Sequence, residues 1–345
     1  MTPIIPRVVP ATASMTVFEP DSPPRVLCYA PYNKWALHGQ WEMTILHALK
    51  QRGADVRYVL CDGLYSDCDV YWEATDPRPP NACELCRHHV LHLVNRLGMD
   101  HEWLGANLLP EERAAAQAWA AGLAPDALRH AVYGDWKIGD WIASSVHSHL
   151  RRSALDVGDP AVERALRSYV YSGLVAAFAL SRLLDAAQPD MLFLFNGRQS
   201  STRVAFELAR SRGIRVVCHE RGYLKETIRL IVNDTCTGLS PVRDLWRDWA
   251  DVPLSLRELR LTQDYLRQRA AGRNLGWKRF SPPPQSSDEL YSRLDLEPDR
   301  PLWALFTSSD DEVAAEEDYQ GPFERQTDWI ARTIAWRRRT PSSTS

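Results

Sequence analysis

The sequence predicts an α/β protein in which a Rossmann-like parallel sheet is flanked by helices and followed by the start of a second α/β domain. Short apolar runs such as Met191–Phe195 are typical of strands buried on both faces of a parallel sheet. Amphipathic helices alternate with these runs, as they do in βαβ units. Only about five strands are recognisable, which argues against a barrel of eight strands. A Rossmann-like sheet is therefore the expected architecture.

Composition and charge are typical of a soluble globular protein. Hydrophobic residues make up 45% of the 345 residues, charged residues make up 25%, and the formal net charge is −3. Because no block of like charges occurs, we expect no nucleic-acid partner. No apolar run approaches the ~18 residues of a membrane span, and segment 1–24 lacks the features of a signal peptide. We expect a disordered, proline-rich leader at 1–24 and a cytoplasmic protein.

The first domain is expected at 25–280, with two βαβ units joined by a long insertion. Its first elements are predicted, in order, as a strand at 26–30, a polar loop at 31–40, a helix at 41–52, a strand at 56–60, a Cys-rich loop at 61–86 and a helical insertion at 88–184. Prolines and glycines interrupt the insertion, so we expect several helices there.

The second βαβ unit carries polar residues at both strand ends. The strand at 191–195 is followed by a turn, by a helix that begins with hydroxyl residues and ends at Gly213, and by a strand at 214–217. Ligands of open parallel sheets bind beyond the carboxyl ends of the strands. The residues predicted to line such a crevice are Asn196, Gly197, Arg198, His219, Glu220, Arg221 and Gly222.

Three of the polar residues at strand ends suggest chemistry. Arg198, beside a helix N-terminus, can bind phosphate or carboxylate, unless Asn196 and Gly197 only form the turn and Arg198 is solvated. Glu220 can act as a general base or bind hydroxyls, unless it forms a structural ion pair with Arg221. His38, after the first strand, can accept a proton from a hydroxyl nucleophile, unless it is a surface or capping residue.

Four cysteines raise the possibility of a metal site. Cys61, Cys68, Cys83 and Cys86 have the spacing C-x6-C-x14-C-x2-C, which predicts a structural zinc site. Thiols without a metal are the alternative, because one CxxC pair is a weaker signal than two. The residues that could replace one thiolate are His88, His89 and His92. The DxD pattern at 67–69 can hold a divalent cation, but three residues recur by chance and we give it no role.

The chain beyond residue 280 is predicted as a linker and the beginning of a second domain. Prolines favour an extended linker at 281–300. Within 301–345 we expect a strand at 302–306, a loop of hydroxyl and acidic residues at 307–311, and a helical region at 312–336. Ser309 and Glu312 also have the spacing of a capping box, which is the alternative to a binding role for this loop.

Two segments resemble the glycosyltransferases of bacterial capsular and surface polysaccharide biosynthesis, which are similar to GT-B enzymes. They are PDMLFLFNGRQSSTRVAFELARSRGIRVVCHERG at 189–222 and LFTSSDDE at 305–312. Weaker support comes from YGDWKIGDWIASSVHSHLRR at 133–152 and from the paired cysteines. The dinucleotide-binding, P-loop, serine-hydrolase and zincin motifs do not occur, so those classes lose their usual sequence signal.

The resemblance implies two Rossmann-like domains with an active site between them. The first would bind the glycan acceptor and the second the nucleotide-sugar donor, with no cofactor required for catalysis. Glu220 or His38 would deprotonate an acceptor hydroxyl. The residues that the resemblance places at the cleft as substrate-binding groups are Asn196, Gly197, Arg198, Arg221, Ser308, Ser309 and Glu312. The resemblance is also compatible with a protein that associates peripherally with membrane-bound polysaccharide assembly machinery.

Members of this family continue past the helix at 326–336 into strands that hold the nucleotide, whereas this chain runs into TIAWRRRTPSSTS. The resemblance therefore predicts a truncated relative, in which donor binding and activity are in question. Two other functions compete with a glycosyltransferase. One is a non-catalytic carbohydrate-binding or partner subunit, and the other is a metal- or redox-sensing protein organised around the cysteines at 61–86. Nucleotide binding would separate the first from an enzyme, and bound zinc or iron would identify the second.

Overall fold

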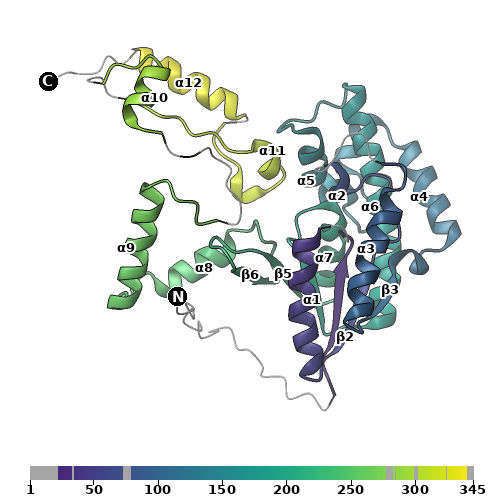
Figure 1. Cartoon of the computed structure of the whole chain (residues 1–345). Helices are drawn as coiled ribbons and strands as arrows, with labels where there is room; N and C mark the ends of the chain where they lie inside the picture. Colours follow the sequence, from purple (N-terminus) through teal and green to yellow (C-terminus); the bar gives the residue numbers. More distant parts are fainter. Residues whose placement is uncertain are drawn as a thin grey trace.

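The computed structural model describes residues 22–32, 35–72, 79–276, 283, 285–298, 302–323 and 325–339. These residues form an α/β fold around a mixed sheet of six strands (Figure 1). The strands are β1 (Arg25–Ala30), β2 (Asp55–Leu60), β3 (Asp100–Trp103), β4 (Met191–Phe195), β5 (Arg215–Arg221) and β6 (Ile228–Val232). Their order in the sheet is β3-β2-β1-β4-β5-β6, and only β6 is antiparallel to its neighbour. The predicted α/β class is confirmed, and the strand order is consistent with a Rossmann-like fold.

Helices cover both faces of the sheet (Figure 1). The helices on one face are α1 (Ala36–Gln51) and α3 (Ala82–Arg96), and those on the other are α4 (Pro110–Gly122), α5 (Ile138–Leu150), α6 (Pro160–Ala187) and α7 (Ser200–Ser211). Successive strand residues serve opposite layers: Cys28 is buried with the first group of helices, while Leu27 and Tyr29 are buried with the second. This double burial explains why the central strands β1 and β4 are almost entirely apolar.

Helix α6 is the centre of the second layer. Asp159 caps it by accepting a hydrogen bond from the Ala161 N–H (2.8 Å), and 15 of its 28 residues are buried. Among the described residues, α6 is the one helix that is long and apolar enough to cross a membrane by length and composition. A core helix has the same composition. A Cβ on Gly173 would lie 2.8 Å from the Ile142 side chain, so this glycine permits the close crossing of α5 and α6.

The elements around the sheet differ from the predicted ones in four places. Helix α1 begins at Ala36 rather than at 41, which brings His38 into its first turn. Strand β5 continues to Arg221, because it pairs with β6, a strand that the sequence analysis did not predict. Strand β3 (DHEW) lies within the predicted helical insertion and pairs with β2 at the edge of the sheet. Its polar sequence lacks the apolar pattern from which strands were predicted. The predicted Cys-rich loop instead contains α2 (Asp69–Trp72) and the start of α3.

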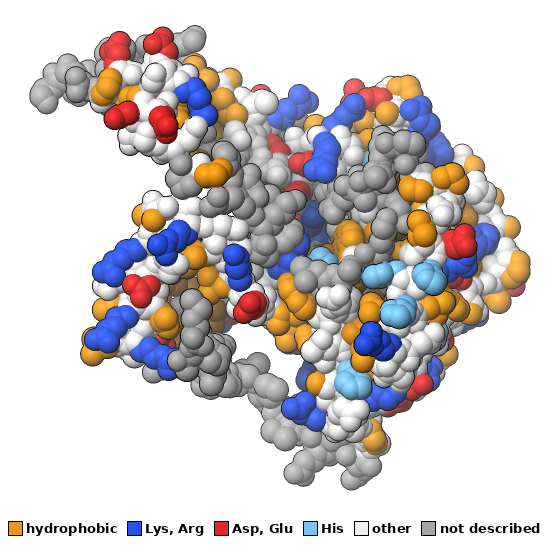
Figure 2. Space-filling model, viewed as in Figure 1, with side chains coloured by type: hydrophobic (Ala, Val, Ile, Leu, Met, Phe, Trp, Pro, Cys, Tyr) orange, Lys and Arg blue, Asp and Glu red, His pale blue; other side chains and the backbone are white. Residues whose placement is uncertain are grey.

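The second half of the chain holds the helices α8 (Ser240–Trp249), α9 (Leu256–Ala270), α10 (Ser287–Arg293), α11 (Asp310–Val313) and α12 (Gln326–Arg339). Short 3-10 turns lie at Leu104–Asn107, Pro125–His130 and Glu317–Tyr319. Helices α8 and α9 bury none of their residues, and Figure 2 shows apolar and basic side chains together over this region.

The predicted strand at 302–306 does not form, and Phe306 is 87% exposed. A strand is stabilised by a hydrogen-bonded neighbour, and the described strands offer this segment none. Helix α10 occupies part of the predicted linker at 281–300, because Ser286 and Glu289 form a capping box. Residues 1–21 of the predicted leader lie outside the described residues.

The buried carboxylate of Asp69 caps helix α7. It accepts hydrogen bonds from the Ser145 hydroxyl (2.6 Å), the Ser201 hydroxyl (2.7 Å) and the Ser201 N–H (3.3 Å). The Ser145 hydroxyl oxygen in turn accepts a hydrogen bond from the Ser200 N–H (2.7 Å). A negative charge is favourable at a helix N-terminus. The DxD pattern at 67–69 therefore supplies a structural anion inside the protein.

We expect Asp69→Ala to lower the free energy of unfolding by roughly 2–4 kcal/mol, because it removes the cap and leaves buried hydroxyls unpaired. Urea denaturation followed by circular dichroism measures this change. Asp67→Ala, two residues earlier and less buried, is the matched control and should cost much less. Equal losses in the two variants would contradict the capping role.

Candidate functional site

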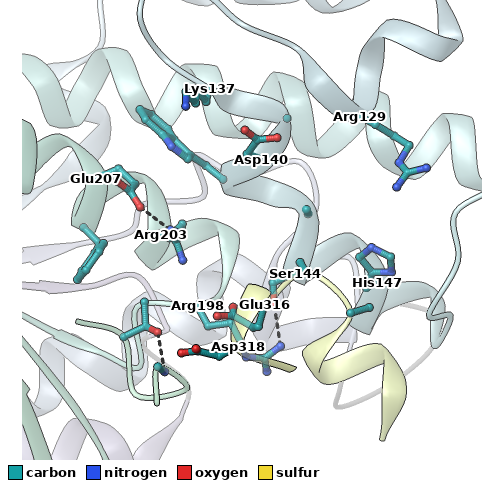
Figure 3. Close-up of a pocket in the computed structure, with 18 of the residues that line it drawn as sticks. Arg129, Lys137, Asp140, Ser144, His147, Arg198, Arg203, Glu207, Glu316 and Asp318 are labelled. Atoms are coloured by element: carbon teal, nitrogen blue, oxygen red, sulfur yellow. Dashed lines mark hydrogen bonds and ion pairs between the residues drawn. The ribbon is translucent and has the colours of Figure 1, made fainter. Parts of the chain in front are cut away.

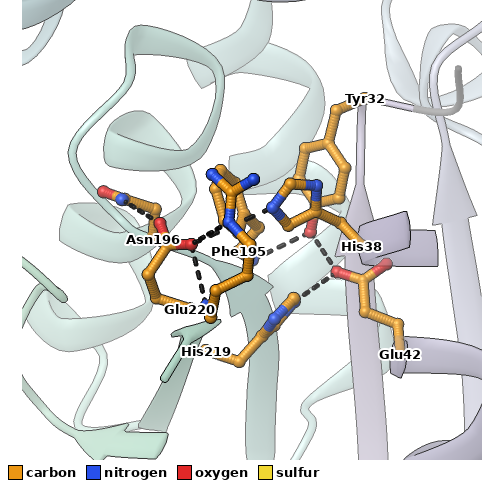
Figure 4. A network of polar contacts seen from close by, with 8 residues as sticks. Tyr32, His38, Glu42, Phe195, Asn196, His219 and Glu220 are labelled. Carbon is orange, nitrogen blue, oxygen red and sulfur yellow. Dashed lines mark hydrogen bonds and ion pairs between the residues drawn. The ribbon is translucent and has the colours of Figure 1, made fainter. Parts of the chain in front are cut away.

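The carboxyl ends of β1 and β4 form the centre of the candidate site. The two strands are parallel neighbours, but the chain leads from β1 to β2 on one side and from β4 to β5 on the other. They therefore mark the topological switch point at which open α/β sheets bind ligands. Residues from the segment after β1, from α1, from the β4–α7 loop and from the end of β5 meet there (Figure 4).

A buried polar network joins these elements. The Tyr32 hydroxyl accepts a hydrogen bond from the Phe195 N–H (2.8 Å) and donates one to Glu42 Oε1. The same carboxylate oxygen accepts a hydrogen bond from His219 Nε2 (2.6 Å). Both Glu42 and His219 are fully buried, and the His219 ring stacks on Phe193. The network thus ties α1 to β1, β4 and β5 at the switch point.

His38 and Glu220 face each other above this network (Figure 4). His38 Nε2 lies 3.9 Å from Glu220 Oε1, and this buried nitrogen has no hydrogen-bond partner among the described residues. The His38 ring packs on Phe195, with 4.1 Å between ring centroids, so its position is fixed. The structure therefore brings together the two predicted catalytic residues, although one lies in a helix and the other in a strand.

Donors surround the Glu220 carboxylate. The Asn196 amide donates a hydrogen bond to Oε2 (2.9 Å), and the Arg221 N–H donates one to Oε1 (2.8 Å). Partial burial by itself would raise the pKa of Glu220, but His38, Asn196 and Arg221 outweigh it and lower the pKa to about 2. Glu220 is therefore ionised at neutral pH, and so low a pKa makes it a poor proton acceptor. Of the two residues, His38 is the one whose ring nitrogen has no hydrogen bond in the described residues.

Hydrogen bonds and close packing fix the Asn196-Gly197 turn. The main-chain oxygen of Asn196 accepts a hydrogen bond from the Cys236 N–H (2.8 Å), and its side-chain oxygen accepts one from the Arg198 N–H (3.2 Å). Gly197 has φ +79°, and a Cβ there would lie 2.9 Å from the Cys218 sulfur, so only glycine fits. The turn thus aims Asn196 at Glu220 while the side chain of Arg198 leaves on the other side.

Arg198 reaches helix α5. Its Nη1 donates hydrogen bonds to the Ser144 hydroxyl (2.7 Å), the Ser148 hydroxyl (3.3 Å) and the main-chain oxygen of Glu312 (2.8 Å). All three acceptors are neutral, so the positive charge of Arg198 is not neutralised by a carboxylate in the described structure. The structure thus brings Arg198 to Glu312, which was also predicted to bind substrate, but the contact is to the main chain of Glu312.

A cavity of about 690 Å³ opens beside Arg198 (Figure 3). We call it the α5–α7 cavity, because helices α5 and α7 form much of its wall. Its cationic lining residues are Arg129, Lys137, Arg198, Arg203 and Arg210, and its acidic lining residues are Asp140, Glu207, Asp234, Glu316 and Asp318. Its volume lies within the range of roughly 300–1,000 Å³ that is usual for small-molecule sites.

His147 on α5 lines the same cavity and was missed by the sequence analysis. Burial lowers the pKa of His147, and Arg129 adds to this effect, while its hydrogen bond to the Arg152 carbonyl oxygen and the charge of Asp311 oppose it. That hydrogen bond (2.8 Å) places the ring proton on Nδ1 and leaves the lone pair on Nε2. The only signal in the sequence is that Ser144, His147 and Ser148 share one helical face.

The other predicted binding residues are more scattered. The guanidinium of Arg221 contacts Glu220 Oε1 (3.3 Å), so the ion-pair alternative for these two residues is also realised. Ser308 exchanges hydrogen bonds with Gln326 away from the α5–α7 cavity. Ser309 stands at the N-cap of α11, but its side chain makes no capping hydrogen bond, so the alternative capping box is not formed.

The four cysteines of the predicted zinc site form no disulfide in the structure. Burial raises the pKa of Cys61 to about 11 and that of Cys68 well above its ordinary value, and neighbouring thiols add to both shifts. Within the described ranges, no group of three or more His, Cys, Asp or Glu side chains is arranged to hold a metal ion. Zinc at these residues stays a prediction.

We expect Glu220 to stabilise the fold above about pH 4.5, its ordinary pKa, and to lose that contribution as the pH falls towards about 2. A shift of this size corresponds to about 3 kcal/mol. Glu220→Gln should therefore lower the free energy of unfolding at pH 7 and flatten its dependence on pH below 4.5. Urea denaturation between pH 2 and pH 7 measures both effects. Glu226→Gln, at an exposed residue, is the control, and an unchanged pH dependence in Glu220→Gln would contradict the assignment.

Comparisons with known proteins assign no family to this chain. No protein-family model matches the chain, and no curated protein matches it. One similar solved structure is described as "structure of a CDPS from Fluoribacter dumoffii". It is 11% identical, the match covers 60% of this chain and 90% of that one, and the TM-score is 0.36. A likeness this weak carries no argument about function.

Proposed function

We propose that the protein transfers a sugar from a nucleotide-sugar donor to a hydroxyl group of a glycan acceptor. The observation that carries this proposal is the buried His38 Nε2, which makes no hydrogen bond in the described residues and faces the ionised Glu220 at the switch point of the sheet. A histidine beside a fixed carboxylate is a common arrangement for removing a proton from a hydroxyl nucleophile. The 3.9 Å separation is compatible with this role, because catalytic contacts are often long before substrate binds.

In the proposed reaction each residue has one task. The acceptor oxygen forms a bond to the anomeric carbon of the sugar while His38 Nε2 takes its proton. The bond between that carbon and the phosphate oxygen breaks, and its electron pair leaves with the phosphate. Glu220 stabilises the imidazolium, and Asn196 keeps Glu220 in position. Arg198, at the edge of the same loop, offers positive charge to the departing phosphate.

A non-catalytic glycan-binding subunit is the second candidate. A specific observation supports it: the low pKa of Glu220, at about 2, makes this residue a lasting hydrogen-bond acceptor rather than a base. A carboxylate beside an asparagine amide provides acceptors and donors for sugar hydroxyls. This alternative retains glycan binding but predicts no turnover of any nucleotide sugar.

We expect His38→Ala to reduce the rate of sugar transfer by roughly 100- to 10,000-fold, the usual contribution of a general base. The assay follows nucleotide release from UDP-, GDP-, CMP- and dTDP-linked sugars in the presence of glycan acceptors. Donor affinity should change little, because the role of His38 is in the proton transfer.

His101→Ala is the matched control, since His101 lies on β3 at the far edge of the sheet. Glu220→Gln should lower the rate at saturating donor more than it changes the Michaelis constant, because Glu220 acts through His38. Glycan binding without turnover in the unaltered chain would favour the second candidate. Full activity of His38→Ala would remove the proposed base.

A further inference from the structure

The α5–α7 cavity is a part of the site that the proposed proton transfer does not use. Figure 3 shows cationic side chains from the α5 and α7 regions around it, with Glu316 and Asp318 of the C-terminal segment at its lower rim. The cations come from separate places in the sequence, including the turn before α5 (Arg129), the start of α5 (Lys137) and the end of α7 (Arg210). Only the tertiary structure collects them at one cavity.

Most of these cations have no carboxylate partner. Arg203 pairs with Glu207 (2.7 Å), but Arg129, Lys137 and Arg210 form no ion pair within 4.0 Å in the described part of the chain. Arg198 is bound only to two hydroxyls and one main-chain oxygen. These four cations line one cavity and none has a carboxylate within 4.0 Å in the described residues, so each is free to pair with a bound anion.

None of the five acids that line the cavity forms an ion pair with these four cations in the described residues. Asp318 accepts a hydrogen bond from the Leu239 N–H (2.9 Å) and pairs with Arg243 (2.7 Å), so it fastens the C-terminal segment to α8. These contacts lower the pKa of Asp318. Glu316 has no cation within 4.0 Å among the residues that the structure describes. The C-terminal segment therefore forms a wall of the cavity and leaves its basic groups open to a ligand.

The chemistry of the lining indicates the class of ligand. Guanidinium groups bind phosphate oxygens in bidentate pairs, and several of them around one cavity suit a group that carries more than one negative charge. The N-terminus of α7, the other natural anion site nearby, is already filled by Asp69. A phosphate group entering from the switch point would thus be directed past Arg198 into the α5–α7 cavity.

We infer that the α5–α7 cavity is a diphosphate-binding site, and that Glu316 on its C-terminal wall weakens the binding by charge repulsion. Under the proposed function, on which this identification of the ligand rests, the diphosphate is that of the donor. The cations that bind it are Arg129, Lys137, Arg198 and Arg210. The wall carboxylate then sets the affinity, because a like charge beside a bound anion favours its release.

Calorimetric titration of the full chain with inorganic pyrophosphate tests this inference. We expect saturable binding with one site per chain. Arg198→Gln and Arg129→Gln should each weaken it by about 10-fold or more, as expected for the loss of a charge-assisted hydrogen bond. Glu316→Gln should tighten binding several-fold. Arg247→Gln, on the exposed surface of α8, should leave the affinity unchanged, and circular dichroism verifies that each variant is folded.

Absence of saturable binding, or binding that neither arginine variant weakens, would overturn the inference. Arg129 is exposed, so its variant remains informative if Arg198→Gln does not fold. The proposed function fails separately. If the protein binds pyrophosphate but turns over no nucleotide sugar, the diphosphate-site proposal holds and the transferase proposal is wrong. If the protein transfers sugar but the arginine substitutions leave its pyrophosphate affinity unchanged, the transferase proposal holds and the diphosphate-site proposal is wrong.

Discussion

The buried carboxylate of Glu42 is the constraint on which the geometry of the switch point depends. It accepts hydrogen bonds from Tyr32 and His219, while the Tyr32 hydroxyl accepts one from the N–H of Phe195, the last residue of β4. A carboxylate removed from water is stable only when donors replace the lost solvent. A shift of helix α1 would break both hydrogen bonds to Glu42 Oε1, and Oε2 has none in the described residues to replace them. His38, one turn before Glu42 on the same face of α1, is thereby fixed opposite Glu220.

The loop of Asn196, Gly197 and Arg198 divides the site into two chemical environments. On one side, the Asn196 amide and the Glu220 carboxylate suit hydroxyl groups. On the other, Arg198 opens onto a cavity whose cations suit an anion. A ligand that spans both sides would carry a hydroxyl at one end and phosphate at the other. The glycine makes this division possible, because a side chain at 197 would collide with Cys218.

Two acidic residues have roles that differ from the usual assignment of carboxylates in an active site. Glu220 is surrounded by donors that keep it ionised, and in the proposed reaction it would contribute charge rather than proton transfer. Asp69 occupies the N-terminus of α7, where a Rossmann-like protein would often bind a phosphate.

The sequence by itself determined the α/β class, the strands β1, β2 and β4, and the polar residues at the ends of β4 and β5, because apolar strands and turn residues are local signals. It could not reveal β3 and β6, whose polar or half-exposed sequences become strands only beside β2 and β5. It also misplaced a strand at 302–306, where no neighbour forms hydrogen bonds. The contact of His38 with Glu220, the cap from Asp69 and the charges around the α5–α7 cavity join residues up to about 180 positions apart. Only the tertiary structure decided them, because burial and distance, not local pattern, bring such side chains together.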